Sequence, residues 1–180
     1  CCQIDLTRLF KNGFITGHGS IREPKDIKTY AALACIAIQS NQNDQHGGQS
    51  IPNFDYDMAE GVRKTYVRNF IRNLDKAFEF NDINLDAKEL IQKIKEENNV
   101  EPKLDDLTIN SYVLDKINHK SANKILDFTL KHTKKETIRD TYQAMESLMH
   151  NLNTMHSRAG AQVPFSSINY GTDTSPEGRL

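Results

Sequence analysis

The sequence of 180 residues has no tryptophan and only three cysteines, at positions 1, 2 and 35. An odd number of cysteines without a secretory signal argues against a disulfide framework. No Cys-x-x-Cys pair is present and the six histidines are scattered, so we expect no metal site in this chain. The sequence also lacks a signal peptide and any apolar run long enough to span a membrane, which favours a cytoplasmic protein that does not engage membranes.

An excess of charge of either sign is missing as well. The chain has 23 Lys and Arg against 24 Asp and Glu. This balance argues against nucleic-acid binding through bulk charge. The length suffices for one domain with its own core, and we treat residues 1–180 as a single segment. Because the chain begins with Cys and stops just after a turn-like sequence, we expect it to be a fragment of a longer protein.

Helical periodicity dominates what is present. The pattern predicts helices over residues 6–12, 26–45, 55–80, 86–97, 104–118, 121–132 and 134–157. The middle of the second of these, AALACIAI, is apolar on all sides and should be buried. In the third, apolar residues recur every four positions, at Val62, Tyr66, Phe70, Leu74 and Phe78. We expect these two long helices to pack side by side and to meet their copies in a second subunit.

The last predicted helix has its own start signal. Thr133 and Glu136 have the spacing of a capping box, with Thr133 as the N-cap residue. The apolar side of this helix is formed by Ile138, Tyr142, Met145, Met149 and Leu152.

The sequence predicts two strands, one before the first helix and one after the last. In Cys1–Leu6 the residues alternate, so that Cys2 shares an apolar side with the aliphatic residues, while Cys1 and Gln3 lie on the other side. The second predicted strand is Ala161–Tyr170. The chain should therefore be mainly α-helical with a few short strands.

Two groups of side chains are candidates for binding. Gln39, Gln42 and Asn43 are spaced to share a helical face, and their amides suit a ligand with several donors and acceptors. The alternative is a solvated helix end. Residues 171–175 follow the second strand and open a turn, where backbone N–H groups can cradle an anion. A plain N-cap and turn is an equally good interpretation of this loop, which consists of Gly171, Thr172, Asp173, Thr174 and Ser175.

Three stretches carry a resemblance to a known family. They are CCQIDL at residues 1–6, QSNQNDQHGGQSIPNFDYD at 39–57 and HSRAGAQVPFSSINYGTDTS at 156–175. Together they resemble the catalytic subunit of the anaerobic (class III) ribonucleoside-triphosphate reductases, which are glycyl-radical enzymes. The resemblance is weak over residues 81–131, which we interpret as a variable helical insertion.

The resemblance implies roles for the candidate residues. The parent fold would be a ten-stranded α/β barrel, and this chain would be the N-terminal part of it. Cys1 would supply a proton and hydrogen to C2′ of the ribose, with Cys2 as the competing thiol. The residues alone favour the alternative that both are small core cysteines. Gln39, Gln42 and Asn43 would bind a nucleotide effector at a dimer interface, and the loop 171–175 would lie near the substrate.

The resemblance also implies cofactors and partners. The parent would be a homodimer that acts on ribonucleoside triphosphates, with allosteric nucleoside triphosphates as effectors. A glycyl radical, a structural zinc and an adenosylmethionine-dependent activase would complete the system, and the residues for the radical and the zinc are absent from this segment. The fragment alone should therefore be inactive. The alternatives are a non-catalytic helical module for nucleotide binding and dimerisation, and a glycyl-radical enzyme with a non-nucleotide substrate.

Overall fold

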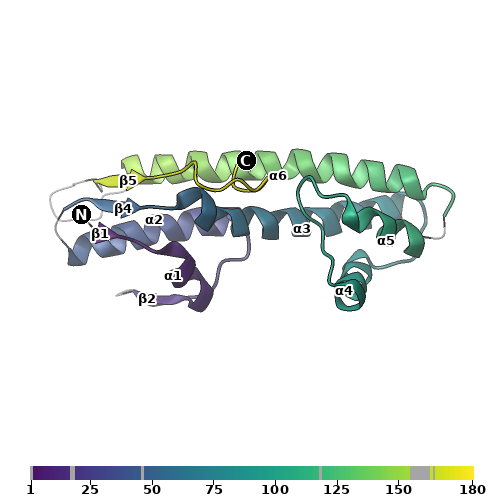
Figure 1. The fold of residues 1–180 in the computed structure, drawn as a ribbon, viewed down its shortest axis with the longest axis horizontal. Coiled ribbons are helices and arrows are strands. Elements are labelled where there is room, and N and C mark those ends of the chain that lie inside the picture. The colour runs from purple at the N-terminus through teal and green to yellow at the C-terminus, as the bar shows by residue number, and fades with distance from the viewer. Residues whose placement is uncertain (1, 17–18, 46, 118, 155–162, 164) are drawn as a thin grey trace. The chain divides into compact units, whose positions relative to one another are not determined.

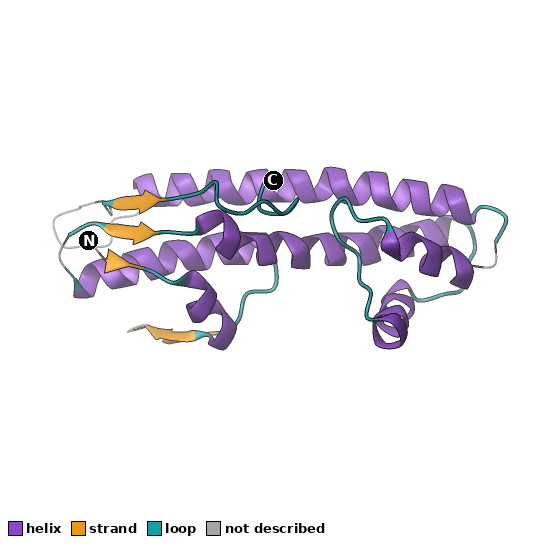
Figure 2. Cartoon of the chain, viewed as in Figure 1, coloured by secondary structure: helices purple, strands orange, loops and turns teal. Residues whose placement is uncertain are grey.

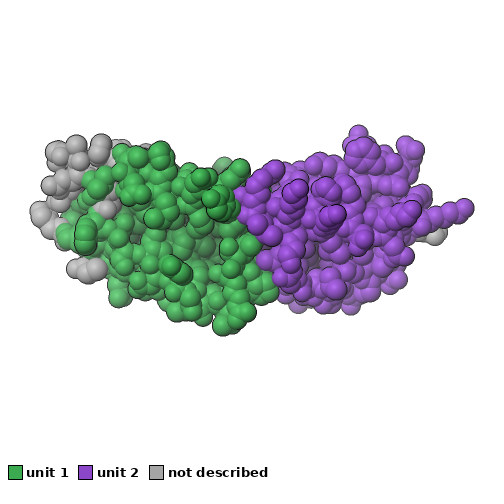
Figure 3. All heavy atoms as spheres, turned by 90° about the horizontal axis from the view of Figure 1, so that it is seen from above, with its two compact units in different colours: residues 1–62, 140–180 green, residues 63–139 purple. Residues whose placement is uncertain are grey.

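The computed structural model describes residues 2–16, 19–45, 47–117, 119–154, 163 and 165–180. The chain divides into two compact units, one formed by residues 1–62 and 140–180 and the other by residues 63–139 (Figure 3). Helices make up most of the described structure and the strands are short, which confirms the prediction of a mainly helical chain.

A small parallel sheet organises the first unit. Its strands are β1 (Cys2–Gln3), β4 (Gln49–Ile51) and β5 (Ser166–Ile168). They lie in the order β1-β4-β5, and both pairings are parallel (Figures 1 and 2). Because neighbouring parallel strands need long crossover connections, helical segments separate them in the sequence.

The helices of the first unit begin at residues that the sequence marks. In α1 (Leu6–Asn12) the Asp5 side chain accepts a hydrogen bond from the Arg8 backbone N–H, and Gly13 ends the helix. In α2 (Ile27–Asp44) Asp26 accepts from the Thr29 N–H in the same way. Between these helices lies an antiparallel hairpin of β2 (Phe14–Thr16) and β3 (Gly19–Ile21), which the sequence analysis did not predict.

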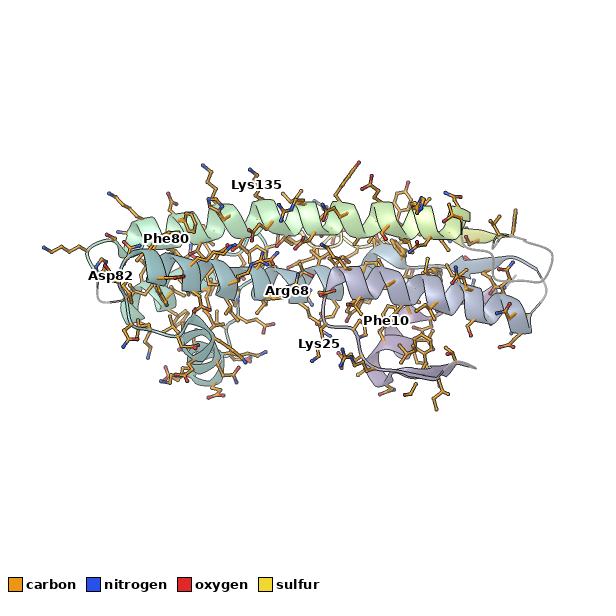
Figure 4. The ribbon with its side chains drawn as sticks, turned by 180° about the vertical axis from the view of Figure 1, so that it is seen from behind. Phe10, Lys25, Arg68, Phe80, Asp82 and Lys135 are labelled. Carbon is orange, nitrogen blue, oxygen red and sulfur yellow. The ribbon has the colours of Figure 1, made fainter. Side chains whose placement is uncertain are left out.

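The core of this unit packs α2 against one face of the sheet and against α3 (Phe54–Phe80) and α6 (Ala122–Thr154). The Tyr30 ring meets Phe10 edge-on with 5.0 Å between ring centroids (Phe10 is labelled in Figure 4). A Cβ atom built on Gly61 would lie 2.8 Å from Cγ of Tyr30, so α3 approaches α2 closely here. Cys35 is buried, and burial raises the pKa of its thiol to about 11. This thiol is therefore a packing residue, and its burial is as predicted for the stretch AALACIAI.

The second unit has a separate apolar core. It comprises the C-terminal part of α3, α4 (Ala87–Asn98), α5 (Thr108–Lys116) and the N-terminal part of α6. Asp86 caps α4 by accepting from the Glu89 N–H. The whole of the predicted insertion, residues 81–131, falls within the range of this unit.

A buried polar seam joins α3 to α6 within the second unit. Asn69 donates to the Thr137 hydroxyl at 3.2 Å, and Asn73 donates to the Thr133 hydroxyl at 3.3 Å. Asn73 also donates to Glu136 at 2.8 Å. The predicted capping box is therefore wrong, because Thr133 and Glu136 lie inside one continuous helix and use their side chains for contacts with α3.

The apolar side predicted for the last helix is also partly wrong. Leu152 is buried, but Ile138, Tyr142 and Met149 are exposed. The buried side of α6 is formed instead by threonines and small or aliphatic residues: Thr129, Thr133, Thr137, Thr141, Ala144, Leu148 and Leu152. Buried threonine hydroxyls with hydrogen-bond partners can replace apolar side chains at a helix interface.

Candidate functional site

The two faces of the parallel sheet differ in character. Gln49 and Ile51 of β4 are buried toward the helices, and the Asn41 amide of α2 donates to the Gln49 side chain. The intervening Ser50 must point to the opposite face because side chains alternate along a strand. Ser50 pairs in register with Gln3 of β1 and with Ser167 of β5. One polar side chain from each strand therefore forms a row on the face turned away from α2.

The two candidate thiols stand at the start of β1. Cys1 lies outside the described residues. Cys2 is half-buried and borders a cavity of about 570 Å³ together with Ile4 and Ala37 of the apolar side. Its backbone N–H donates to the carbonyl of Gly48, which anchors it to β4.

The loop predicted to cradle an anion binds a carboxylate of the protein itself, that of Asp55. The backbone N–H groups of Gly171, Thr172 and Asp173 donate to Oδ2 of Asp55 at 2.8, 2.7 and 2.8 Å. The Thr172 hydroxyl donates to the other carboxylate oxygen at 3.1 Å. Burial alone would raise the pKa of Asp55, but these hydrogen bonds and one from the Tyr56 backbone lower it to about 2. The carboxylate is thus ionised at neutral pH.

A second set of hydrogen bonds fixes the C-terminal end of the loop. Asp173 accepts from the Ser175 N–H at 2.8 Å and from the Ser175 hydroxyl at 2.9 Å. The same hydroxyl accepts from the Gly178 N–H at 3.1 Å, so Ser175 caps the turn that follows, which agrees with the interpretation of this loop as an N-cap and turn. Gly171 has φ of 99°, a conformation that side chains disfavour.

The three amides at the end of α2 do not share one accessible face. Gln42 is buried and its amide donates to the Val163 carbonyl at 3.5 Å. Gln39 is half-buried, and its amide nitrogen has no hydrogen-bond partner among the described residues. Asn43 is exposed. Gln39 is thus the member of this group with an unsatisfied hydrogen-bond donor.

Comparison with known proteins decides the family. The family model described as anaerobic ribonucleoside-triphosphate reductase matches residues 1–180. The chain belongs to this family. The resemblance seen in the three sequence stretches is thereby confirmed for the whole chain.

Relatives from a phage and from bacteria agree with this assignment. The anaerobic ribonucleoside-triphosphate reductase of Enterobacteria phage T4 is 24% identical over 97% of this chain, and that of Escherichia coli (strain K12) is 26% identical over 100%. The enzyme of the same name from Salmonella typhimurium (strain LT2) is 23% identical over 100% of the chain. The chain spans only 18 to 21% of the length of these relatives.

Several residues of this reductase segment that matter to the site were missed from the sequence. The row of Gln3, Ser50 and Ser167 needs the register of three strands, and the sequence analysis predicted just two of them, without β4. Asp55 resembled any acidic residue in the first turn of a helix. A signal for it existed, because a loop that presents backbone N–H groups and hydroxyls favours an anionic partner, which a carboxylate of the chain can supply.

A cavity of about 660 Å³ lies beside the loop in the first unit, between α3, α6 and the C-terminal turn. Its walls are mainly apolar, with Met58, Met145 and Leu148 among them. Within the described residues there is no cluster of three or more His, Cys, Asp or Glu side chains that would suit a metal ion. Among the same residues, none of the helices is both long and apolar enough to cross a lipid bilayer.

Proposed function

We propose that this chain is the N-terminal part of the catalytic barrel of an anaerobic reductase that converts ribonucleoside triphosphates to deoxyribonucleotides by radical chemistry. The observation that carries the proposal is the family match over all 180 residues. The parallel arrangement of β1, β4 and β5 supports it, because a barrel of α/β type is built from such strands and uses their ends for its site. The expected location is the cytoplasm.

Cys1 is the thiol that we propose for the chemistry, and Cys2 is its competitor. By strand alternation Cys1 falls on the side of Gln3, whereas Cys2 falls on the side of Ile4, toward α2. The polar row of Gln3, Ser50 and Ser167 then flanks the substrate. Hydroxyls and amides suit ribose hydroxyls, which both donate and accept hydrogen bonds.

The overall reaction replaces the C2′–OH bond by C2′–H, releases the hydroxyl as water and consumes two electrons. The thiol of this segment supplies its proton to the departing hydroxyl, and after a proton from solvent has restored the S–H group the same thiol supplies the hydrogen to C2′. A reductant, either formate or a dithiol protein, supplies the electrons. The glycyl radical, formed by an adenosylmethionine-dependent activase, and the structural zinc belong to parts of the enzyme outside this sequence.

We further propose that the C-terminal end of α2, with Gln39, Gln42 and Asn43, contributes to a nucleotide-effector site in a homodimer. The unpartnered Gln39 amide supports this proposal, because a buried donor without a partner costs about 1–3 kcal/mol and is satisfied by a ligand group. The alternative is a non-catalytic module that binds nucleotide and dimerises without using Cys1.

The decisive experiment is an anaerobic assay of the full-length protein with its activase, a reductant and ribonucleoside triphosphates. We expect deoxyribonucleotide formation. The 180-residue chain under the same conditions should form none, because the parts of the enzyme that generate radicals are missing. Nucleotide binding by the activated full-length protein without any product would favour the non-catalytic alternative.

A further inference from the structure

The cavity of about 660 Å³ in the first unit has two buried carboxylates in its wall, those of Asp55 and Glu177. The loop N–H groups satisfy Asp55. Among the described residues, nothing donates a hydrogen bond to the Glu177 carboxylate or forms an ion pair with it, although only 5% of this residue is exposed. A buried carboxylate without a partner is unfavourable. Glu177 therefore needs a partner from outside the described residues.

The turn that carries Glu177 is fixed by its own hydrogen bonds. The Ser175 hydroxyl accepts from the Gly178 N–H, and the Ser175 carbonyl accepts from the Arg179 N–H, both at 3.1 Å. A Cβ atom built on Gly178 would overlap the Asp173 side chain, so the turn packs directly against it. Arg179 also borders the cavity, but within the described part of the chain it forms no ion pair with Glu177. The Glu177 oxygens are not fully enclosed, so a group that enters the cavity can reach them.

The surroundings of this carboxylate are apolar and exposed. Figure 1 shows the segment after β5 running along α6, and the cavity lies between this segment, α6 and α3. Four large apolar residues of the segment border the cavity with much of their surface accessible, and we call them the rim: Val163, Phe165, Tyr170 and Leu180. Exposed apolar residues gathered at one place are typical of an interaction site.

The chemistry of the cavity restricts what can fill it. A carboxylate accepts hydrogen bonds and donates none, so its partner must carry N–H groups, and a Lys or Arg side chain also supplies the opposite charge. A free metal ion or ammonium ion would leave the rim exposed, and an anion would meet the Glu177 charge. The chain spans only 18 to 21% of the length of its relatives, so the full-length protein has many further residues that can supply both kinds of group.

We propose that this cavity is the docking site for a segment of the full-length protein outside these 180 residues, which presents a Lys or Arg side chain to Glu177 and apolar side chains to the rim. The inference takes from the proposed function only that the chain is part of a longer protein. The docked segment lies beside the turn that follows loop 171–175 and gives Glu177 the partner that it lacks.

The test is photo-crosslinking from the rim in the full-length protein. Tyr170→p-benzoylphenylalanine places a photoreactive group at a position that is 80% exposed, so folding should not be disturbed. We expect irradiation to give a product with the mass of one chain, in which this position is joined to a peptide from outside residues 1–180. Mass spectrometry of the digested product should identify that peptide, and the peptide should contain a Lys or Arg beside apolar residues.

Tyr56→p-benzoylphenylalanine is the matched control, because Tyr56 is an exposed tyrosine of the same unit that does not border the cavity. It should not capture the same peptide. The proposal is overturned if Tyr170→p-benzoylphenylalanine captures nothing, captures only residues 1–180 or captures a peptide without Lys or Arg. A product with the mass of two chains also overturns it, because a second copy would then cover the cavity.

The ion pair has a test of its own. Glu177→Lys sets two cations against each other, so capture from the rim should fall at least about tenfold, because a buried charge without its partner is strongly unfavourable. Exchanging the captured Lys or Arg for Glu in the same protein should restore capture. Glu146→Lys should leave capture unchanged, because Glu146 is exposed on α6 and does not border the cavity.

Unchanged capture in Glu177→Lys would show that Glu177 is not the docking contact. If this variant does not fold, Glu177→Gln removes the charge and keeps the shape, and a smaller loss of capture supports the contact, whereas an unchanged yield contradicts it. Capture is measured without activase, reductant or nucleotide. A wild type that makes no deoxyribonucleotide would therefore overturn the proposed function and leave the docking contact standing, and an active reductase without capture would overturn the docking contact alone.

Discussion

At the residue scale, the two adjacent cysteines make the most direct test of the chemistry. In the full-length enzyme Cys1→Ser should abolish product formation with fold and effector binding intact, because an O–H bond is much stronger than a thiol S–H bond and cannot return hydrogen to the sugar. Cys2→Ser should leave turnover largely intact and lower stability modestly, since it places a hydroxyl on the side of Ile4.

A paired assay of turnover and melting temperature measures both effects. If Cys2→Ser removes turnover and Cys1→Ser does not, the two faces of the strand are exchanged and the assigned register is wrong by one residue.

The two acidic residues at the start of α3 have opposite electrostatic environments. The hydrogen bonds to Asp55 lower its pKa, so its contribution to stability is present above the ordinary Asp value and is lost as the pH falls through about 2. Burial raises the pKa of Asp57, and the nearby Asp5 charge raises it further. The hydrogen bond from the Thr7 hydroxyl lowers this pKa but does not outweigh these effects. The ionised form of Asp57 is therefore disfavoured in the folded state, and its cost grows as the pH rises above the ordinary Asp value.

Asp57→Asn should remove this pH-dependent cost while keeping an acceptor for the Thr7 hydroxyl. The free energy of unfolding of the variant relative to wild type should increase between about pH 4 and pH 7, where an ordinary Asp is ionised. Urea unfolding at both pH values measures the difference. A relative stability that is flat or falls with rising pH would show that the Asp57 carboxylate is adequately solvated or paired.

At the element scale, the sequence predicts helices better than it predicts their ends. The bounds of α1 follow from Asp5 and Gly13, and those of α2 follow from Asp26 and the polar run after Ile38, because caps and apolar periodicity are local signals. The start of α6 was misplaced because Thr133 and Glu136 have cap spacing but serve a tertiary contact. Local sequence cannot distinguish these uses of a threonine, since the partner Asn73 lies 60 residues away.

The seam between α3 and α6 should be important for the stability of the second unit. Asn73 is buried and donates to Thr133 and Glu136, and Arg72 pairs with the same Glu136 at 2.7 Å. Burial works against ionisation of Glu136, but the Arg72 and Asn73 hydrogen bonds lower its pKa overall. Asn73→Ala removes the donor to the buried Thr133 hydroxyl and one of the two donors to Glu136.

We expect Asn73→Ala to lower the free energy of unfolding by about 1–3 kcal/mol, the usual cost of unsatisfied buried polar groups. Asn98→Ala is the control, because Asn98 is exposed and its side chain bonds, among the described residues, only to the carbonyl of Ile94 in its own helix. Its effect should stay below about 0.5 kcal/mol. Equal losses in the two variants, measured by chemical denaturation, would mean that the seam is not a specific stabilising contact.

At the scale of the whole molecule, the family and the mainly helical character could be predicted from the sequence, whereas the candidate site could be predicted only in part. The loop 171–175 was found because glycine and hydroxyl residues are local signals. Asp55 and the row on the sheet were not, because they depend on which strands become neighbours. The partner of a loop 116 residues away is set by topology, which one sequence does not reveal.

The proposed homodimer requires a different surface from the one expected. Most apolar residues of α2 and the stripe from Val62 to Phe78 on α3 are buried within the chain itself, so they are not available to a second subunit. The large apolar residues that remain exposed on the first-unit part of α6 are Tyr142 and Met149, with 69% and 53% of their surface accessible. Exposed apolar residues on one helix face are typical of an interface.

The full-length protein should therefore be a dimer that Tyr142→Glu combined with Met149→Glu weakens, because burying two carboxylates at an apolar interface is unfavourable. The control is Phe80→Glu, which replaces an even more exposed aromatic residue, 81% accessible, at the end of α3 (labelled in Figure 4). Sedimentation velocity over a concentration series would show a larger monomer fraction for the double variant only. Dimerisation that the double variant leaves unchanged would exclude this face of α6, and a monomeric wild type would remove the basis for placing an effector site between two copies.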